Sequence, residues 1–132
     1  MTMGVNHLGH FYLTHLLWDL VKAADKPRVI NVSSIAHLGT GFNRSMNYID
    51  FDDINMLKEY TTRNAYARSK MANVLFTRML QAKMDEANIK GFSYSLHPGV
   101  IFTEMGRHFG AIYPILKALL LPISLIFTKT EW

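Results

Sequence analysis

Apolar side chains recur at helical spacing over two long stretches of the chain. The first stretch runs from about Thr2 to Ala24, and the residues that form its wide apolar face are Val5, Leu8, Tyr12, Leu16 and Leu20. The second begins near Ala65 and runs to about Ala87, with the same spacing at Leu75, Phe76, Met79 and Leu80. Two long amphipathic helices are therefore predicted.

Two short runs rich in β-branched or aromatic residues are predicted to be strands. Residues 28–34 follow the helix-ending Pro27 and have the continuous apolar pattern of a strand buried on both faces. Residues 92–97 alternate aromatic or aliphatic side chains with serine and stop at Pro98. Helix, turn and buried strand in succession are typical of a parallel α/β sheet. We therefore expect Ser34, the start of the second helix and the Pro98 loop to converge at the sheet edge where ligands bind in such folds.

The segment between the first strand and the second helix, residues 35–64, shows little periodicity and many turn-forming residues. Roughly thirty residues of weakly structured chain are uncommon inside a compact domain, and such segments are often functional. This segment is therefore a candidate for a functional role.

Length and composition indicate one globular domain or part of one. The chain has 132 residues, of which 49% are hydrophobic and 18% charged. It has no cysteine, which excludes disulfides and thiolate metal sites. The net charge of +4 comes from scattered Lys and Arg residues, so nucleic acid is not an expected partner.

Neither end of the chain has the pattern of a targeting or membrane-spanning segment. Residues 1–20 carry no Lys or Arg and no cleavage site of the kind found in signal peptides. The apolar run 111–127 is interrupted by Lys117 and contains Pro114 and Pro122, and it is shorter than a spanning helix needs. Lid formation or buried packing is predicted for this run, and peripheral contact with a membrane is the alternative.

Tyr66 and Lys70 lie four residues apart on the second predicted helix, so they share a face. A phenol is a poor base at neutral pH, but an ammonium fixed beside it favours the phenolate. The pair can thus act as a general acid and base. Such a pair also arises by chance in many helices, and if the pair is considered alone, chance is the preferred interpretation.

Four segments together resemble the short-chain dehydrogenase/reductase family, and most closely its retinol dehydrogenase-like branch. They are Val5-Asn6-His7-Leu8-Gly9-His10-Phe11, Arg28-Val29-Ile30-Asn31-Val32-Ser33-Ser34, Tyr66-Ala67-Arg68-Ser69-Lys70-Met71-Ala72-Asn73 and His97-Pro98-Gly99-Val100. The resemblance implies an α/β fold with a partial Rossmann-like parallel sheet and flanking helices. It also implies an NAD(P)-dependent oxidoreductase that interconverts an alcohol and its carbonyl.

The resemblance assigns catalytic roles to four residues. Tyr66 would exchange the proton with the substrate oxygen, and Lys70 would favour the phenolate and hydrogen-bond the nicotinamide ribose. Ser34 would hold the substrate oxygen. Asn6 would help to fix Lys70 through a water and its own helix backbone.

The resemblance also implies a cofactor and a substrate class. Cofactor-binding residues would be Tyr66, Lys70, Pro98, Gly99, Ile101 and Thr103, and NADP(H) is favoured over NAD(H). The substrate would be an apolar small molecule such as a retinoid, lipid or steroid. The expected location is intracellular, either cytoplasmic or peripheral on an internal membrane; no oligomeric state is predicted.

No metal site is predicted, although four histidines are possible metal ligands. His7, His10, His15 and His108 could in principle ligate a metal. The family carries the same His-Leu-Gly-His run without a metal, so packing or local hydrogen bonding is the preferred interpretation.

Parts of the family pattern are missing from residues 1–132. The chain lacks the Gly-rich turn that receives the pyrophosphate, and it stops before the family's next helix and last strand. We therefore expect the catalytic, C-terminal portion of one doubly wound domain, marginally stable by itself and without useful affinity for NADP(H). The alternative is a non-catalytic fragment or interaction module that lost cofactor binding.

Overall fold

A computed structural model of the chain describes residues 1–39 and 48–99. Residues 1–97 form one compact unit, and Pro98 and Gly99 belong to a second. Predictions for residues 100–132, including Ile101, Thr103 and the apolar run 111–127, lie outside the described residues. In residues 1–39 and 48–99, no helix is long and apolar enough to cross a membrane.

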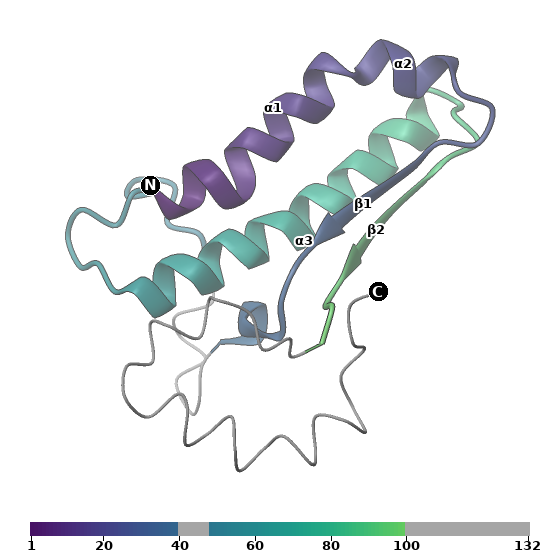
Figure 1. Cartoon of the computed structure of the whole chain (residues 1–132). Helices are drawn as coiled ribbons and strands as arrows, with labels where there is room; N and C mark the ends of the chain where they lie inside the picture. The colour runs from purple at the N-terminus through teal and green to yellow at the C-terminus, as the bar shows by residue number, and fades with distance from the viewer. Residues whose placement is uncertain (40–47, 100–132) are drawn as a thin grey trace, which may run out of the picture. The chain divides into compact units, whose positions relative to one another are not determined.

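The first unit contains helices and two strands in alternating order (Figure 1). The elements are the π-helix η1 (Gly4–Leu8), α1 (Gly9–Leu16), α2 (Trp18–Ala23), β1 (Arg28–Val32), the 3-10 helix η2 (Ile35–Leu38), α3 (Thr62–Glu86) and β2 (Phe92–Leu96). The predicted order of helix, strand, helix and strand is confirmed.

The predicted first helix is divided into three parts. In η1 the Gly9 N–H donates to the Gly4 carbonyl, five residues earlier, which widens the first turns. Leu17 departs from helical angles between α1 and α2, but its N–H still donates to the Leu13 carbonyl. A π-turn inside a helix often accompanies a functional site, and this one lies against α3.

The strands β1 and β2 pair in parallel, in register from Arg28 opposite Phe92 to Val32 opposite Leu96. Beyond the strand ends, the Ser33 N–H donates to the Leu96 carbonyl at 2.8 Å. Position 91, directly before β2, requires glycine, because a Cβ there would lie 2.6 Å from Pro27 Cγ. The α/β class with a parallel sheet is confirmed, since α3 forms the crossover that parallel pairing requires.

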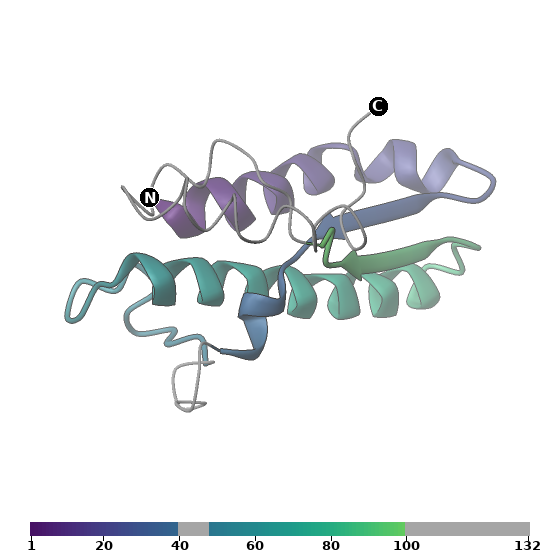
Figure 2. The same ribbon diagram turned by 60° about the horizontal axis from the view of Figure 1, so that its bottom comes forward.

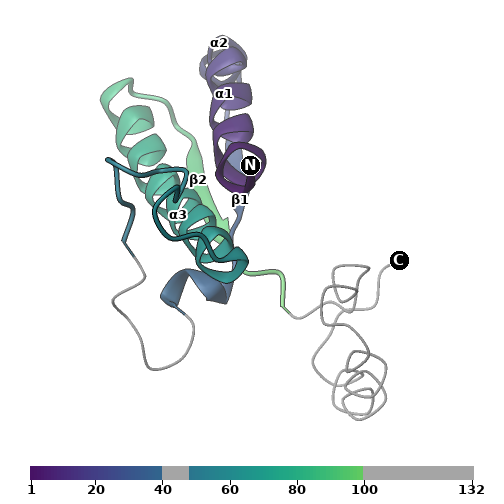
Figure 3. The same cartoon turned by 90° about the vertical axis from the view of Figure 1, so that its left-hand side faces the viewer.

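Helix α3 packs along both strands and against η1. Figures 2 and 3 show α1 beside α3. The rings of Phe11 in α1 and Phe76 in α3 are in contact, with centroids 5.3 Å apart. The inner face of α3 is built largely from small residues, which let neighbouring backbones approach closely: Ala65, Ala67, Ser69, Ala72, Asn73 and Thr77 are all buried.

The prediction that the first strand is buried on both faces is wrong for the described unit. Within β1 only Asn31 is buried, whereas Ile30 and Val32 are 55% and 50% exposed. Asn31 contacts Thr77 of α3, so the alternate residues Ile30 and Val32 point to the opposite face. No element described in the first unit buries that face.

The N-terminus of α3 lies earlier in the chain than predicted. Thr61 has extended backbone angles, and its hydroxyl accepts a hydrogen bond from the Asn64 N–H at 3.2 Å. A threonine in this position satisfies one of the free N–H groups of the first turn. The helix therefore begins at Thr62, four residues before Tyr66.

We predict that Met84→Ala lowers the free energy of unfolding by about 2–5 kcal/mol, because it removes buried methylenes and leaves a cavity. Met84 is completely buried in α3. Met79→Ala, on the same helix but 69% exposed, is the matched control. Urea unfolding measures both changes, and equal losses would contradict this packing.

Candidate active site

Helix α3 places Tyr66 and Lys70 one turn apart on its surface. Both side chains are half-buried, and Lys70 Nζ lies 5.6 Å from the centroid of the Tyr66 ring. This is within the range of a cation–π contact. The ammonium is thus held on the tyrosine side of the helix, next to the phenol.

The Lys70 ammonium is anchored on the end of the neighbouring strand. Nζ donates to the carbonyl of Val32, the last residue of β1, at 3.0 Å. Burial lowers the pKa of Lys70 from its ordinary value of 10.5. One of its three N–H donors is used in this bond, which leaves the others for a ligand.

The two serines after β1 have different roles. Ser33 is buried, and its hydroxyl donates to the Lys70 carbonyl at 2.8 Å, which ties the strand end to α3. Ser34 is half-buried, and its oxygen accepts from the Ala36 N–H at 3.2 Å and caps η2. The Ser34 O–H proton can therefore be donated to another group. Among described residues, no direct hydrogen bond joins the hydroxyls of Ser34 and Tyr66.

Asn6 in η1 contacts the same part of α3. Its side-chain Nδ2 donates to the Ser69 hydroxyl at 3.1 Å, and that hydroxyl donates to the Tyr66 carbonyl at 2.7 Å. The Asn6 carbonyl accepts from Asn73 Nδ2 at 3.0 Å. Asn6 therefore reaches the helix that carries Tyr66 and Lys70 through Ser69 and Asn73.

Asn73 is a central residue of this site that sequence reasoning missed. It is 3% exposed, and its Nδ2 donates to two carbonyls, those of Asn6 at 3.0 Å and Val32 at 3.2 Å. Its Oδ1 lies 3.0 Å from His7 Nδ1. The sequence feature that could have indicated its role is a polar asparagine, three residues after Lys70, on a helix face where buried residues are usually apolar.

The histidines form hydrogen bonds and ring contacts. His7 bonds Asn73, and His10 Nδ1 donates to the Asn6 carbonyl at 3.1 Å. The His15 ring stacks on Tyr12 with centroids 6.3 Å apart. Within residues 1–39 and 48–99 no group of three potential ligands could hold a metal. His108 lies outside these ranges.

Pro98 and Gly99 belong to the second unit and are considered separately. Gly99 has φ +88°, a left-handed conformation that favours glycine, and no heavy atom lies within 4 Å of the position a Cβ would take. This glycine therefore presents bare backbone with open space beside it.

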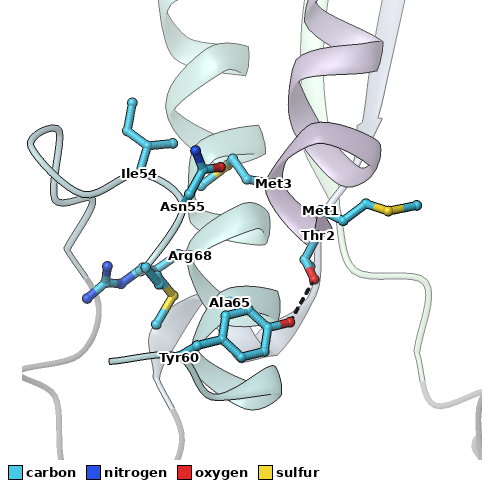
Figure 4. A pocket seen from close by; sticks show the side chains of 9 residues that line it. Met1, Thr2, Met3, Ile54, Asn55, Tyr60, Ala65 and Arg68 are labelled. Atoms are coloured by element: carbon cyan, nitrogen blue, oxygen red, sulfur yellow. Dashed lines mark hydrogen bonds between the residues drawn. The ribbon is translucent and has the colours of Figure 1, made fainter. Parts of the chain in front are cut away.

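A small pocket lies near the start of α3 and is distinct from this site (Figure 4). Thr2 and Tyr60 lie on its border, with their hydroxyl oxygens 3.4 Å apart. Its volume of about 10 Å³ is close to that of one water-sized probe. Neither Tyr66 nor Lys70 lines it, so it is not where a substrate would meet the tyrosine.

A strand end joined to a crossover helix that carries Tyr66 and Lys70 defines a partial Rossmann-like α/β unit. No protein-family profile matches the chain. Human retinol dehydrogenase 13 is 47% identical over 111 residues, 83% of this chain and 31% of that protein. Human retinol dehydrogenase 14 is 40% identical over 130 residues, 98% of this chain and 36% of that protein.

A solved structure shares the same fold. The crystal structure of an uncharacterised protein from Mycobacterium paratuberculosis has a TM-score of 0.62 and 36% identity, covering 88% of this chain and 40% of that one. The chain spans about a third of the length of the curated relatives it matches. The resemblance to the retinol dehydrogenase-like branch of the short-chain dehydrogenase/reductase family is confirmed, since homology to its members covers most of the sequence.

Burial of Lys70 predicts a particular dependence of stability on pH. Its pKa is lowered in the folded state, so below 10.5 the folded protein binds fewer protons than the unfolded protein. The free energy of unfolding therefore gains a contribution that rises with pH and levels off above 10.5. In Lys70→Met this contribution is absent.

The measurement is urea unfolding of the wild type and Lys70→Met at several pH values from about 7 to 10.5. We expect the wild type to gain stability relative to the variant as the pH rises. Lys26→Met, at a solvent-exposed position, should retain the wild-type dependence. Parallel curves for the wild type and Lys70→Met would refute the burial of this ammonium.

Proposed function

We propose that the protein to which these residues belong is an NAD(P)-dependent oxidoreductase that interconverts an alcohol and its carbonyl. Residues 1–132 would form the catalytic portion of a single short-chain dehydrogenase/reductase domain. The observation that carries this proposal is the Lys70 ammonium, which lies against the Tyr66 ring and is anchored on the Val32 carbonyl. The names of the homologues support the same reaction class.

Tyr66 acts as the proton-transfer group in this proposal. A positive charge beside a phenol favours the phenolate, and Lys70 supplies that charge from one turn away. In alcohol oxidation the Tyr66 oxygen accepts the proton of the substrate hydroxyl, and in carbonyl reduction its O–H returns that proton. The Ser34 O–H donates to the substrate oxygen, which keeps the reacting carbon in position.

The described residues fit the nicotinamide end of a dinucleotide. Lys70 keeps N–H donors that Val32 does not use, which suits ribose hydroxyls. Gly99, in the second unit, is assigned to the cofactor by the family resemblance alone. When bound, the nicotinamide supplies the site for hydride transfer. The preference for NADP(H) over NAD(H) comes from the family resemblance alone.

The proposed substrate is apolar: a retinoid, lipid or steroid alcohol or its carbonyl. The retinol dehydrogenase names of the relatives support this class. The apolar run 111–127 of the sequence supports it as well. Peripheral membrane contact through that run, and an intracellular location, stay predictions.

Tyr66→Phe in the whole protein should lower the turnover number by at least about 100-fold, because general acid–base catalysis contributes about 10²–10⁴. Affinity for the dinucleotide, measured by calorimetry, should change little. Tyr94→Phe, on the half-exposed face of β2, is the matched control and should retain turnover. Unchanged turnover in Tyr66→Phe would reject the oxidoreductase, and absent dinucleotide binding by the whole protein would favour the non-catalytic alternative.

A further inference from the structure

The carbonyl of Val32 accepts two hydrogen bonds from α3. One comes from Lys70 Nζ at 3.0 Å, and the other comes from Asn73 Nδ2 at 3.2 Å. The anchor of the ammonium is therefore shared with a buried amide. Contacts that hold the Asn73 side chain in place therefore also hold the Val32 carbonyl, to which Lys70 donates.

The orientation of the Asn73 amide follows from its partners. Nδ2 points to the carbonyls of Asn6 and Val32, which can only accept. Oδ1 must then be the atom that meets His7, so His7 Nδ1 carries a proton and donates to it at 3.0 Å. In this orientation both amide protons and the amide oxygen form hydrogen bonds. The flipped amide would place its oxygen against two carbonyl oxygens that cannot donate.

The same amide joins three elements. Asn6 and His7 lie in η1, Val32 ends β1, and Asn73 itself lies in α3. A second buried bond, from Asn31 Nδ2 to Thr77 Oγ1 at 2.9 Å, joins β1 to α3 one turn further along. That bond contacts neither the Val32 carbonyl nor Lys70. Thr77 Oγ1 also donates to the Asn73 backbone carbonyl at 2.8 Å, but this bond lies within α3 and does not involve the Asn73 amide. The chain thus contains a buried polar link for comparison.

We propose that Asn73 is a positioning residue: by binding the Val32 and Asn6 carbonyls together, it holds the end of β1 and η1 against α3 and so places the Lys70 ammonium beside Tyr66. The inference rests on the proposed function, in which Lys70 favours the Tyr66 phenolate. Without the Asn73 amide, the Ser33–Lys70 bond still ties the strand end to α3, but the Val32 carbonyl loses its second donor and η1 loses its bond to Asn73 Nδ2. Lys70 can then leave this acceptor and turn toward water.

The test compares Asn73→Leu with Thr77→Val in the whole protein. Leucine has a similar volume but no donor, and valine matches threonine in shape while removing the comparison bond. In Asn73→Leu we expect kcat for alcohol oxidation to fall by about tenfold or more. The pH of half-maximal oxidation should rise by about one unit, because the ammonium no longer assists the phenol. Thr77→Val should lower the Tm but leave kcat within about twofold of the wild type and the pH of half-maximal oxidation unchanged.

A second measurement does not depend on turnover. Nuclear magnetic resonance follows the titration of the Lys70 side chain in both variants, together with Tyr66 of α3 and the histidines His7 and His37 of η1 and η2, which both pack against α3. Release of Lys70 in Asn73→Leu should move its titration toward that of an exposed lysine, while Thr77→Val retains the wild-type curve. If Asn73→Leu does not fold, Asn73→Ser keeps one donor and should give a smaller shift in the same direction.

The outcomes separate the two proposals. An unchanged Lys70 titration and an unchanged pH profile in a folded Asn73 variant would overturn the positioning role. A shifted Lys70 titration in a protein without alcohol or carbonyl turnover would reject the proposed function and leave the positioning role supported.

Discussion

The structure depends on one backbone carbonyl, that of Val32 at the end of β1. A parallel strand ends with polar groups that its partner strand cannot all satisfy, and these must find other hydrogen bonds. Here Lys70 and Asn73 of α3 both donate to this carbonyl. The contact that completes the strand end is therefore also the contact that holds the ammonium.

Close packing makes this arrangement possible. Alanines and Ser69 line the inner face of α3, so η1 and β1 lie near enough for short polar side chains to bridge them. Bulkier residues on this face would push the backbones apart, and the amide of an asparagine could not span the gap. Small residues around Tyr66 thus set the distance that the polar side chains must span, although the alanines among them form no side-chain hydrogen bond.

Local patterns in the sequence predicted the elements well, and tertiary partners decided the rest. Helical spacing and the proline before β1 were enough to predict α3 and the strands, and the spacing of Tyr66 and Lys70 predicted that they share a face. Exposure of Ile30 and Val32 could not be predicted, because burial depends on which elements cover a face and not on the strand itself. The role of Asn73 also escaped prediction, since its three partners come from two elements far away in sequence.

Buried polar side chains, and not only apolar ones, hold β1 against α3. Two separate buried links join β1 to α3: the Asn31–Thr77 side-chain bond, and the bond from the Asn73 amide to the Val32 carbonyl one turn earlier on the helix. Apolar residues would fill the same volume, but they tolerate small shifts in position, whereas fully satisfied hydrogen bonds specify one register. The proposed acid–base pair needs such a register at the Asn73 amide, which shares its acceptor with Lys70, since misplacement by about 1 Å can cost about 100-fold in rate. The interior of this unit is thus polar where position matters most and apolar where volume alone is needed, as at Met84.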